Sequence, residues 1–349
     1  MTRKQLAFGS AAIGAALMAA RISRKRRAID LSNRVALITG GSRGLGLLLA
    51  RELGRSGTRV VLAARDQSEL DVALRDLESR GIEASTIVAD IAEASDAERI
   101  VDVVVTRYGG LDILVNNAGV IKVGPLDHMT HADFDEAMST HFWGPLRTMR
   151  AAIPHMRQRG GGRIVNISSI GGKIGVPHLV PYCASKFALT GLSTAMRGEL
   201  LTDDIYITTV SPGLMRTGSP FNAWFKGQHR QEFAWFAIAD SLPLLSIDAD
   251  RAARQIVDAL RHGDAELVVS WPARIAIAAS AAMPNTVAFA MSVANGLLPS
   301  QADANGEESR SGWQSGSRVA PSILTRLSER AAAVNNEIPQ SSGVRPAHP

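Results

Sequence analysis

The feature that most constrains the fold is a series of seven short apolar runs spaced along residues 31–270. They are VALIT (35–39), RVVLAA (59–64), ASTIVAD (84–90), LDILVN (111–116), GRIVNIS (162–168), IYITTVS (205–211) and AELVVS (265–270). Continuous apolar runs of this length are typical of buried parallel strands, and each gap has room for a helix. The pattern therefore predicts one doubly wound α/β domain with a parallel sheet of about seven strands.

Residues 1–30 are predicted to form a hydrophobic anchor segment in front of this domain. Residues 6–20 are apolar or small throughout, and Lys and Arg flank them on both sides. As a helix they would span about 22 Å, against a hydrocarbon core of roughly 30 Å, and flanking cations extend that reach. We expect membrane contact through residues 5–21, with the basic cluster of residues 21–27 and the α/β domain on the cytoplasmic side. The alternatives are an interfacial helix, a signal-like segment, or a disordered arm of a cytoplasmic protein.

The chain after residue 270 divides into two segments of different composition. Residues 271–299 are apolar but interrupted by Pro284, which makes each half too short to span a membrane. We expect a helical segment that packs on the domain or on a partner subunit, with membrane contact as the less favoured alternative. Residues 300–349 are rich in Ser, Gly, Gln, Asn and Pro, which predicts a mostly disordered tail with one short helix near 322–334.

The charge distribution argues against a nucleic-acid-binding function. The net charge is +5, but residues 1–34 hold eight Lys or Arg and one Asp, which leaves −2 for the remaining 315 residues. A mildly acidic body is not a general phosphate-binding surface, so we predict no nucleic-acid partner. The single cysteine, Cys183, excludes an internal disulfide and a cysteine-built zinc site. We predict no metal site.

A glycine-rich loop follows the first predicted strand and precedes an amphipathic stretch. It reads Thr39-Gly40-Gly41-Ser42-Arg43-Gly44-Leu45-Gly46. Glycines at positions 40, 44 and 46 allow a tight turn and close approach to a pyrophosphate, whose charge the free N–H groups of the helix start would meet. Glycine-rich turns also occur for purely structural reasons, but the strand before and the helix after favour a Rossmann-like dinucleotide site.

The end of the second predicted strand indicates which dinucleotide binds. An NAD site commonly places Asp or Glu there, on the ribose 2′-hydroxyl, whereas this sequence has Ala64 followed by Arg65. Arg65 and Arg43 offer two guanidinium groups suited to a 2′-phosphate, so the predicted cofactor is NADP(H). The alternative is a pair of solvated arginines without a ligand.

Tyr182 and Lys186 are spaced so that on a helix they share one face. The Lys186 ammonium would then lie beside the Tyr182 phenol. A nearby cation favours the phenolate and lowers the pKa of the phenol from about 10, which makes it a usable general acid and base. Ser169 lies thirteen residues upstream of Tyr182, after the predicted strand 162–168, where its hydroxyl can bind a substrate oxygen. These three are the candidate catalytic residues.

In the order and spacing of its motifs the chain resembles the short-chain dehydrogenase/reductase family, in particular the subgroup with Thr-Gly-x-x-x-Gly-x-Gly and Tyr-x-x-x-Lys. The resemblance covers about residues 31–270 and includes Asn116-Asn117-Ala118-Gly119 and Pro212-Gly213 with Thr217. It implies that Asp90 and Ile91 flank the adenine, that Asn117, Ala118 and Gly119 line the cofactor, and that Pro212, Gly213 and Thr217 hold its nicotinamide end. It also implies that Tyr182 exchanges a proton with the substrate, that Lys186 lowers the pKa of Tyr182 and binds the nicotinamide ribose, and that Ser169 positions the carbonyl.

One position departs from the family pattern. The family commonly has Asn in the helix after the fourth strand, before two bulky residues and Gly-Pro, where it helps hold a water of the proton relay. Here His141 precedes Phe142-Trp143-Gly144-Pro145. A histidine can bind that water or relay a proton itself. The alternative is a hydrogen-bonded core histidine without a catalytic part.

These observations together predict an NADP(H)-dependent oxidoreductase that interconverts a carbonyl and an alcohol. The family resemblance also implies that residues 217–250 form the substrate lid, and they contain Phe221, Trp224, Phe225, Phe233, Trp235 and Phe236. Packing of a lid helix would use about half of these, and the rest would form an aromatic wall around a lipophilic substrate. The rival hypothesis is a catalytically inactive, membrane-tethered dinucleotide-binding sensor or scaffold. Self-association into a homo-oligomer is a further expectation.

Overall fold

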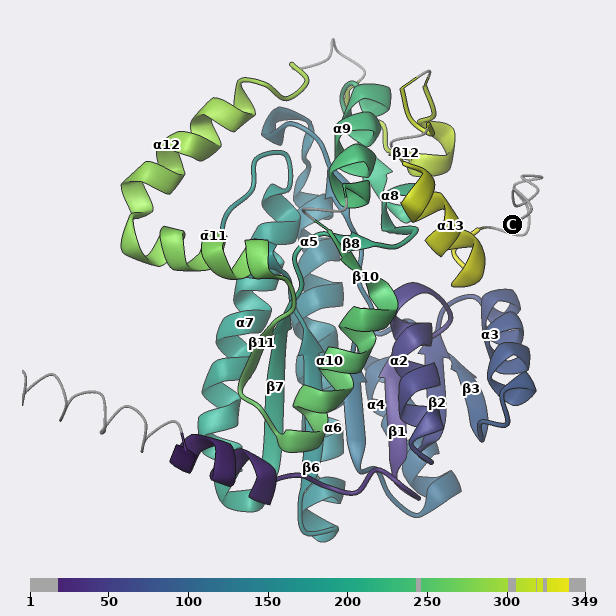
Figure 1. The fold of residues 1–349 in the computed structure, drawn as a ribbon. Helices are drawn as coiled ribbons and strands as arrows, with labels where there is room; N and C mark the ends of the chain where they lie inside the picture. Colours follow the sequence, from purple (N-terminus) through teal and green to yellow (C-terminus); the bar gives the residue numbers. More distant parts are fainter. Residues whose placement is uncertain (1–17, 243–245, 301–305, 318, 323–324, 339–349) are drawn as a thin grey trace, which may run out of the picture.

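The computed structural model describes residues 18–242, 246–300, 306–317, 319–322 and 325–338. Its centre is a seven-stranded parallel sheet in the order β11-β7-β6-β4-β1-β2-β3 (Figure 1). The strands are β1 (Val35–Thr39), β2 (Arg59–Ala64), β3 (Ala84–Val88), β4 (Ile113–Asn116), β6 (Gly162–Ile167), β7 (Ile205–Ser211) and β11 (Glu266–Val268). Each predicted run forms one of these strands, with ends within two residues of the prediction. The doubly wound α/β fold is confirmed.

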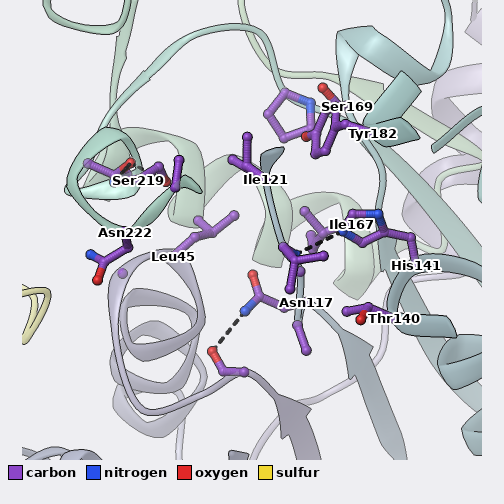
Figure 2. A pocket seen from close by; sticks show the side chains of 18 of the residues that line it. Leu45, Asn117, Ile121, Thr140, His141, Ile167, Ser169, Tyr182, Ser219 and Asn222 are labelled. Carbon is purple, nitrogen blue, oxygen red and sulfur yellow. Dashed lines mark hydrogen bonds between the residues drawn. The ribbon is translucent and has the colours of Figure 1, made fainter. Parts of the chain in front are cut away.

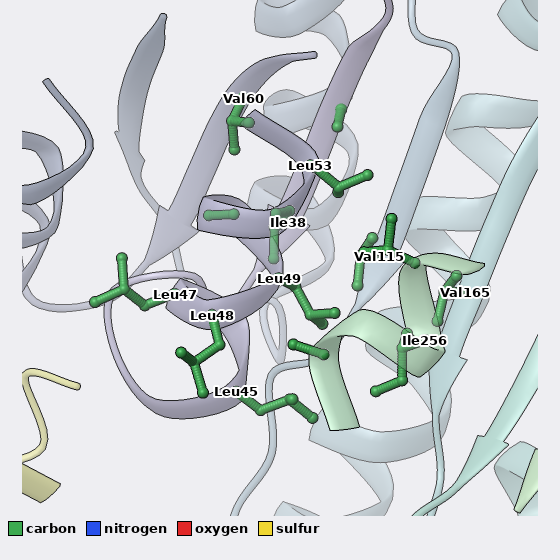
Figure 3. Close-up of a cluster of buried hydrophobic side chains, with 14 of the residues drawn as sticks. Ile38, Leu45, Leu47, Leu48, Leu49, Leu53, Val60, Val115, Val165 and Ile256 are labelled. Carbon is green, nitrogen blue, oxygen red and sulfur yellow. The ribbon is translucent and has the colours of Figure 1, made fainter. Parts of the chain in front are cut away.

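Helices cover both faces of the sheet. One face carries α2 (Gly44–Arg55), α3 (Gln67–Ser79) and α10 (Ala249–His262), and the other carries α4 (Ala94–Tyr108), α6 (Gly144–Gln158) and α7 (Val180–Leu200). Figure 3 shows part of the first core, where Leu49 of α2 and Ile256 of α10 lie with Val115 of β4 and Val165 of β6. Because side chains on both faces of the central strands are buried, the strands read as continuous apolar runs rather than alternating ones.

The strand order places a binding crevice at the carboxyl edge of the sheet. Strand β1 lies between β4 and β2, so the chain leaves β1 toward one side and later returns to the other. Ligands of doubly wound sheets bind at such a switch point, outside the carboxyl ends of the strands. The glycine-rich loop follows β1, Asn117 follows β4, and Ser169 comes two residues after the end of β6. The topology therefore brings the predicted motifs to one edge.

A cap of short elements stands over this edge (Figure 1). Its elements are β5 (Lys122–Val123), β8 (Met215–Arg216), α8 (Ser219–Asn222), β9 (Trp224–Phe225), α9 (His229–Ser241), β10 (Ile247–Asp248), β12 (Arg310–Ser311), η5 (Gly312–Gln314) and α13 (Arg326–Val334). The connections are completed by η1 (Leu126–His128), α5 (His131–Met138), η2 (Ser139–Trp143), η3 (Ile170–Gly172) and η4 (Leu201–Asp203). A separate apolar core around Phe221, Phe225 and Phe233 holds the cap together.

Part of the C-terminal tail has regular structure where its composition predicts disorder. The described residues between 306 and 338 form β12, η5 and α13, and α13 falls within the range in which the sequence predicts a short helix. Long-range contacts supply the order, since β12 pairs with β9 and the Trp313 ring stacks on Phe221 at 4.8 Å between centroids. Composition alone carries no signal for such contacts.

The apolar segment 271–299 forms the predicted helix pair, α11 (Trp271–Ala282) and α12 (Pro284–Asn295), and Pro284 begins the second helix. The expected packing on the domain is confined to the start of α11: Ala273 is the one buried residue of α11, and none is buried in α12. Both helices project from the side of the molecule (Figure 1), with Phe289 and Leu297 exposed. The expected packing on a partner subunit stays a prediction.

The N-terminal segment meets the domain through its basic cluster. Residues 18–26 are helical, and Arg24 forms ion pairs with Asp258 (2.6 Å) and Asp264 (2.8 Å). Most of the predicted anchor, residues 1–17, lies outside the described residues. In the part of the chain that the structure describes, no helix combines the length and the apolar character that crossing a bilayer requires.

Candidate active site

A cavity of about 640 Å³ lies at the carboxyl edge of the sheet, beneath the cap. Figure 2 shows Ser169 and Tyr182 at one end and Leu45, Ser219 and Asn222 at the other. All but one of the residues predicted to bind the cofactor or to carry out catalysis line it: Gly40, Ser42, Arg43, Gly44, Leu45, Arg65, Asp90, Ile91, Asn117, Ala118, Gly119, Ser169, Tyr182, Lys186, Pro212, Gly213 and Thr217. The fold thus gathers the separate sequence motifs around one space. Their individual roles stay predictions.

Gly46 is the exception, because it does not line the cavity. A Cβ at this position would strike the Gly40 carbonyl oxygen and lie 2.6 Å from Nδ2 of Asn117. Its lack of a side chain therefore serves close packing of α2 on the loop, one of the roles that glycine has in such turns. Position 46 thus supports the loop from behind, and its contact with the cofactor stays a prediction.

The glycine-rich loop is held in place from β4. Asn117 Nδ2 donates to the Gly40 carbonyl oxygen at 2.9 Å, and Thr39 Oγ1 accepts from the Asn117 N–H at 3.1 Å. Gly40 adopts φ +61°, and a Cβ there would lie 2.7 Å from Cα of Ala118. The loop thus requires glycine for both its backbone conformation and its close approach to the next strand. The Asn-Asn-Ala-Gly motif supports the glycine-rich loop as well as lining the cavity.

The two arginines proposed for a 2′-phosphate stand at the solvent-exposed end of the cavity. Arg43 Nη1 donates to Glu69 Oε1 at 2.6 Å, and Ser42 Oγ donates to Oε2 of the same carboxylate at 2.8 Å. Arg65 is 64% exposed and lies 3.6 Å from Asp90. Each guanidinium has an acidic neighbour, so a phosphate placed here competes with carboxylates that are already present. Glu69, from the first turn of α3, was not among the predicted site residues.

The candidate catalytic residues come from two elements. Ser169 follows β6, and its Oγ accepts from the Gly171 N–H at 3.0 Å. Tyr182 and Lys186 lie in α7, as the spacing predicts, with Lys186 Nζ 5.6 Å from the centroid of the Tyr182 ring. Lys186 Nζ donates to the Ile167 carbonyl oxygen at 2.8 Å, which anchors the side chain on β6. Ser169 and Tyr182 lie at the same end of the cavity in Figure 2, called the inner end, and Lys186 also lines the cavity.

Burial, rather than the neighbouring cation, sets the protonation of this inner end. Burial raises the pKa of Tyr182 to about 12, although the hydrogen bond with Ser169 acts in the opposite direction. Burial also lowers the pKa of Lys186 to about 7. The lowered tyrosine pKa that the sequence predicts is therefore wrong for this structure. The physical reason is that desolvation of the buried phenol disfavours its charged form more than its surroundings favour it.

His141 is a hydrogen-bonded core histidine. It lies in η2, where its Nε2 accepts from the Val120 N–H at 3.1 Å and its Nδ1 lies 2.8 Å from Ser185 Oγ (Figure 2). Since Nε2 is the acceptor, the proton of the neutral ring resides on Nδ1. Burial, and then the Lys186 charge, lower the pKa of His141 well below its ordinary value. Both ring nitrogens are thus engaged, which favours the core-histidine alternative over a proton relay through this ring.

The aromatic residues of the lid divide between the cavity and the cap core. Phe221, Trp224, Trp235 and Phe236 line the cavity, while Phe225 and Phe233 are fully buried in the core beside it. Trp224 and Phe225 lie in strand β9 rather than in a helix, and strand alternation places Trp224 42% exposed and Phe225 inside. The expected division between packing and lining is therefore found, with a strand in place of part of the lid helix.

Several cavity residues carry no signal in the sequence. Asp240 of α9 is buried, and burial raises its pKa to about 8. Ser311, Trp313 and Glu337 come from the tail, and burial raises the pKa of Glu337 to about 7. A single carboxylate in a helix or in a polar tail is too common to single out, and the contacts of the tail span almost the entire chain. A structure was required to find them.

Comparison with known proteins places these motifs in a wider group. A family model described as short chain dehydrogenase matches residues 34–223. Dehydrogenase/reductase SDR family member 4 from Mus musculus is 34% identical over 204 residues, which cover 58% of this chain and 73% of that protein. Gluconate 5-dehydrogenase from Gluconobacter oxydans is 37% identical over 191 residues, which cover 54% of this chain and 73% of that protein.

A solved structure agrees in fold. L-Sorbose reductase from Gluconobacter frateurii, complexed with NADPH and L-sorbose, is 26% identical and superposes with a TM-score of 0.62. The similarity covers 69% of this chain and 97% of that one.

Proposed function

We propose, because this chain belongs to the short-chain dehydrogenase family of oxidoreductases, that it is an NADP(H)-dependent enzyme interconverting a lipophilic ketone or aldehyde and its alcohol. The observation that carries the proposal is the convergence of Ser169, Tyr182 and Lys186 at the inner end of one cavity whose outer end is the glycine-rich loop. The nicotinamide of the bound cofactor supplies or accepts the hydride. The remaining chemistry belongs to side chains of this protein.

Tyr182 is the group that exchanges the proton with the substrate oxygen. With a pKa of about 12 the phenol is protonated at neutral pH, so it is ready to donate to a carbonyl oxygen during reduction. The Ser169 hydroxyl lies at the same end of the cavity as the phenol (Figure 2) and in this proposal positions the substrate oxygen beside it. Lys186 is held in place by its hydrogen bond to the Ile167 carbonyl oxygen, and in this proposal it contacts the cofactor ribose.

Titration with NADPH followed by a carbonyl screen tests the proposed activity. We expect NADPH to bind with a change in its fluorescence and to be consumed when a carbonyl substrate is present. Tight binding without turnover on any carbonyl would instead indicate the dinucleotide-binding sensor or scaffold. The absence of any binding, to NADPH or NADH, would contradict both functions.

The preference for NADP(H) over NAD(H) rests on the outer end of the cavity. Arg43 and Arg65 both line it, and no acidic residue follows β2 directly. The loop also suits a dinucleotide, because Gly44 and Gly46 carry no side chain where α2 begins and its free N–H groups favour an anion. We expect NADPH to bind at least tenfold more tightly than NADH, or by about 1.4 kcal/mol. Equal affinities would contradict the preference.

The proposal of a lipophilic substrate rests on the four lid aromatics that line the cavity. Aromatic faces favour a bulky apolar ligand over a heavily hydroxylated one. A kinetic panel of steroid-like and long-chain ketones against sugars and short hydroxy acids tests this substrate class. A higher kcat/KM for the polar set would reject it, and the gluconate- and sorbose-named relatives define that set.

We also propose membrane association through residues 5–21, with the catalytic domain in the cytoplasm. It rests on the apolar run and its basic flanks. The full chain is expected to sediment with membranes and to resist high-salt washing. A chain that begins at Ile22 keeps the Arg24 ion pairs and should be soluble and still bind NADPH. Release of the full chain by salt alone would favour electrostatic attachment.

We also propose that the chain forms a homo-oligomer in which a second copy covers the exposed faces of α11 and α12. Trp271, Ile275, Phe289 and Leu297 are each more than half exposed, and a second copy of the chain would cover such an apolar surface. Analytical ultracentrifugation of the chain that begins at Ile22 tests this. We expect a dimer or larger assembly that Phe289→Glu dissociates, and a monomeric unmutated chain would contradict it.

A further inference from the structure

The C-terminal residues 325–338, called the strap below, lie on the glycine-rich loop although almost the whole sequence separates the two. Figure 1 shows α13, which makes up most of the strap, above the start of α2 and beside α8 and α9. The strap packs on α9 and β8. It therefore reaches the cavity from the side at which the predicted pyrophosphate site opens.

Polar groups of the strap bind the loop backbone. The Gly44 N–H, at the start of α2, donates to the Asn335 carbonyl oxygen at 2.9 Å. Asn336 Nδ2 donates to the carbonyl oxygens of Ser42 (2.9 Å) and Glu69 (3.0 Å). One of the N–H groups at the start of α2 that favour an anion thus already has a partner from the chain itself.

Glu337 brings a carboxyl group to the same place. The Gly218 N–H donates to its Oε2 at 2.7 Å, and its Oε1 lies 2.8 Å from the position that a Cβ of Gly44 would take. Glu337 is 4% exposed, and the ionisable groups that interact with it are Arg43, Glu69 and Asp240. Gly44 lacks a side chain where a dinucleotide pyrophosphate would approach the backbone, and here the carboxyl of Glu337 fills that space.

The space at Gly44 admits one of these two groups, because a pyrophosphate that approaches the Gly44 backbone would meet the Glu337 carboxyl that now fills this space. We propose that the strap is an intramolecular competitor of the dinucleotide, and that Glu337 is a residue which sets cofactor affinity by leaving the loop before the cofactor binds. This inference rests on the proposed function, since it concerns the affinity of the same cofactor site.

The docked strap is held by contacts that are numerous but mostly polar. In α13 only Ser328 and Ala332 are buried, and Ser328 Oγ lies 2.7 Å from Ser241 Oγ of α9. Asn335 Oδ1 accepts from Arg51 at 2.9 Å, and the Glu337 carbonyl oxygen accepts from Asn222 at 3.0 Å. Such a small apolar contact is suited to a segment that exchanges between docked and released states.

A reversible tether provides the decisive test. Ser241→Cys combined with Ser328→Cys places two thiols where the hydroxyls now touch, so that oxidation would lock the strap on α9. We expect the oxidised double variant to bind NADPH at least tenfold more weakly than the same protein after reduction, with each single variant insensitive to the reductant. An unchanged dissociation constant in the oxidised, cross-linked protein would overturn the proposal.

A point variant provides a second measurement. Glu337→Ala removes both the carboxyl at Gly44 and the bond to Gly218, and we expect the dissociation constant for NADPH to fall threefold or more. Glu307→Ala, which removes an exposed carboxylate of the same tail, should leave it unchanged. Equal affinity of the Glu337→Ala and unmutated chains would count against the competition.

Hydrogen exchange supplies a readout that needs no turnover. Adding NADPH to the full chain should accelerate exchange at the amides of residues 328–337, because the strap leaves the loop. Slower exchange in these residues would mean that the strap closes over the cofactor instead, which overturns the competition. Failure of every form to bind NADPH or NADH would refute the proposed function itself, whereas equal binding with the strap locked or free refutes only this inference.

Discussion

The two ends of the cavity differ in the environment of their ionisable side chains. At the inner end, Tyr182, Lys186 and His141 are withdrawn from water, and burial moves each pKa toward the neutral form. At the outer end, Arg43 and Arg65 keep contact with solvent and each faces a carboxylate. Desolvation therefore shifts the pKa values at the inner end, whereas the two arginines at the outer end pair with carboxylates in contact with solvent.

This difference predicts unequal responses to mutation. A buried group at the inner end has no water to replace a lost partner, so its removal is costly. An exposed arginine at the outer end is hydrated, and its ion pair contributes little. The predictions below test this contrast in order of decreasing effect.

Tyr182→Phe should have the largest effect, because it removes the proton that the proposed mechanism transfers to the substrate. We expect turnover to fall by a factor of about 10² or more while the dissociation constant for NADPH stays within about twofold. Tyr108→Phe at the end of α4, which deletes a hydroxyl hydrogen-bonded to Ser85 of β3, is the matched control. Near-normal turnover of Tyr182→Phe would place the proton donor elsewhere.

Lys186 should make stability depend on pH. Because burial lowers its pKa from 10.5 to about 7, the unfolded chain binds more protons between those values, and the free energy of unfolding rises with pH across that window. We expect urea denaturation to show an increase on the order of 3 kcal/mol or less between pH 7 and 10.

Lys186→Met should flatten this dependence, whereas Lys25→Met, at an exposed position, should retain it. A slope that survives in Lys186→Met would assign the effect to another group and break the contrast between the two ends.

His141→Phe should destabilise the fold without a catalytic signature of its own. It leaves the Val120 N–H without its acceptor, at a cost of about 1–3 kcal/mol. Because the pKa of His141 lies well below 6.5, we expect the kcat of the unmutated enzyme to show no inflection at the histidine pKa between pH 6 and 7. If the pH profile of kcat does show an inflection in this range and His141→Asn abolishes it, the result would support a proton relay through His141.

Arg65→Ala should have the smallest effect, and only on the choice of cofactor. We expect the affinity for NADPH to fall by a factor of about 3–10 and that for NADH to stay unchanged. The loss should diminish as salt is added, because the site is exposed. Arg150→Ala on α6, also exposed, is the control. Equal losses for both cofactors would indicate that Arg65 supports the loop rather than reads a 2′-phosphate.

The α/β domain could be predicted from sequence because its information is local. Each strand is recognisable in the sequence as an apolar run. The glycine-rich loop and Ser169 lie at strand ends, and Tyr182 and Lys186 lie on one helix face. Once the strands pair, the topology alone brings these motifs together. The contacts of the tail are different, since Glu337 reaches Gly218 across 119 positions and is surrounded by residues of ordinary polar composition.

The pKa values at the inner end could not be predicted from the sequence either, for a related reason. The spacing of Tyr182 and Lys186 indicates a shared helix face, but the depth of that face below the surface depends on β6, η2 and the cap together. The sequence likewise leaves open whether His141 relays a proton or is a core residue. Its hydrogen bonds with Val120 and Ser185 favour the core role. Geometry that depends on several distant elements at once requires the folded chain.

The position of the strap in the chain has a consequence for biosynthesis. Every segment that builds the glycine-rich loop and the inner cavity wall leaves the ribosome before the strap is translated. At ordinary rates of elongation the interval between residue 270 and the strap is on the order of 10 s. During that interval the newborn domain can take up a dinucleotide with no rival from its own sequence, so the order of translation gives the cofactor the first opportunity to load.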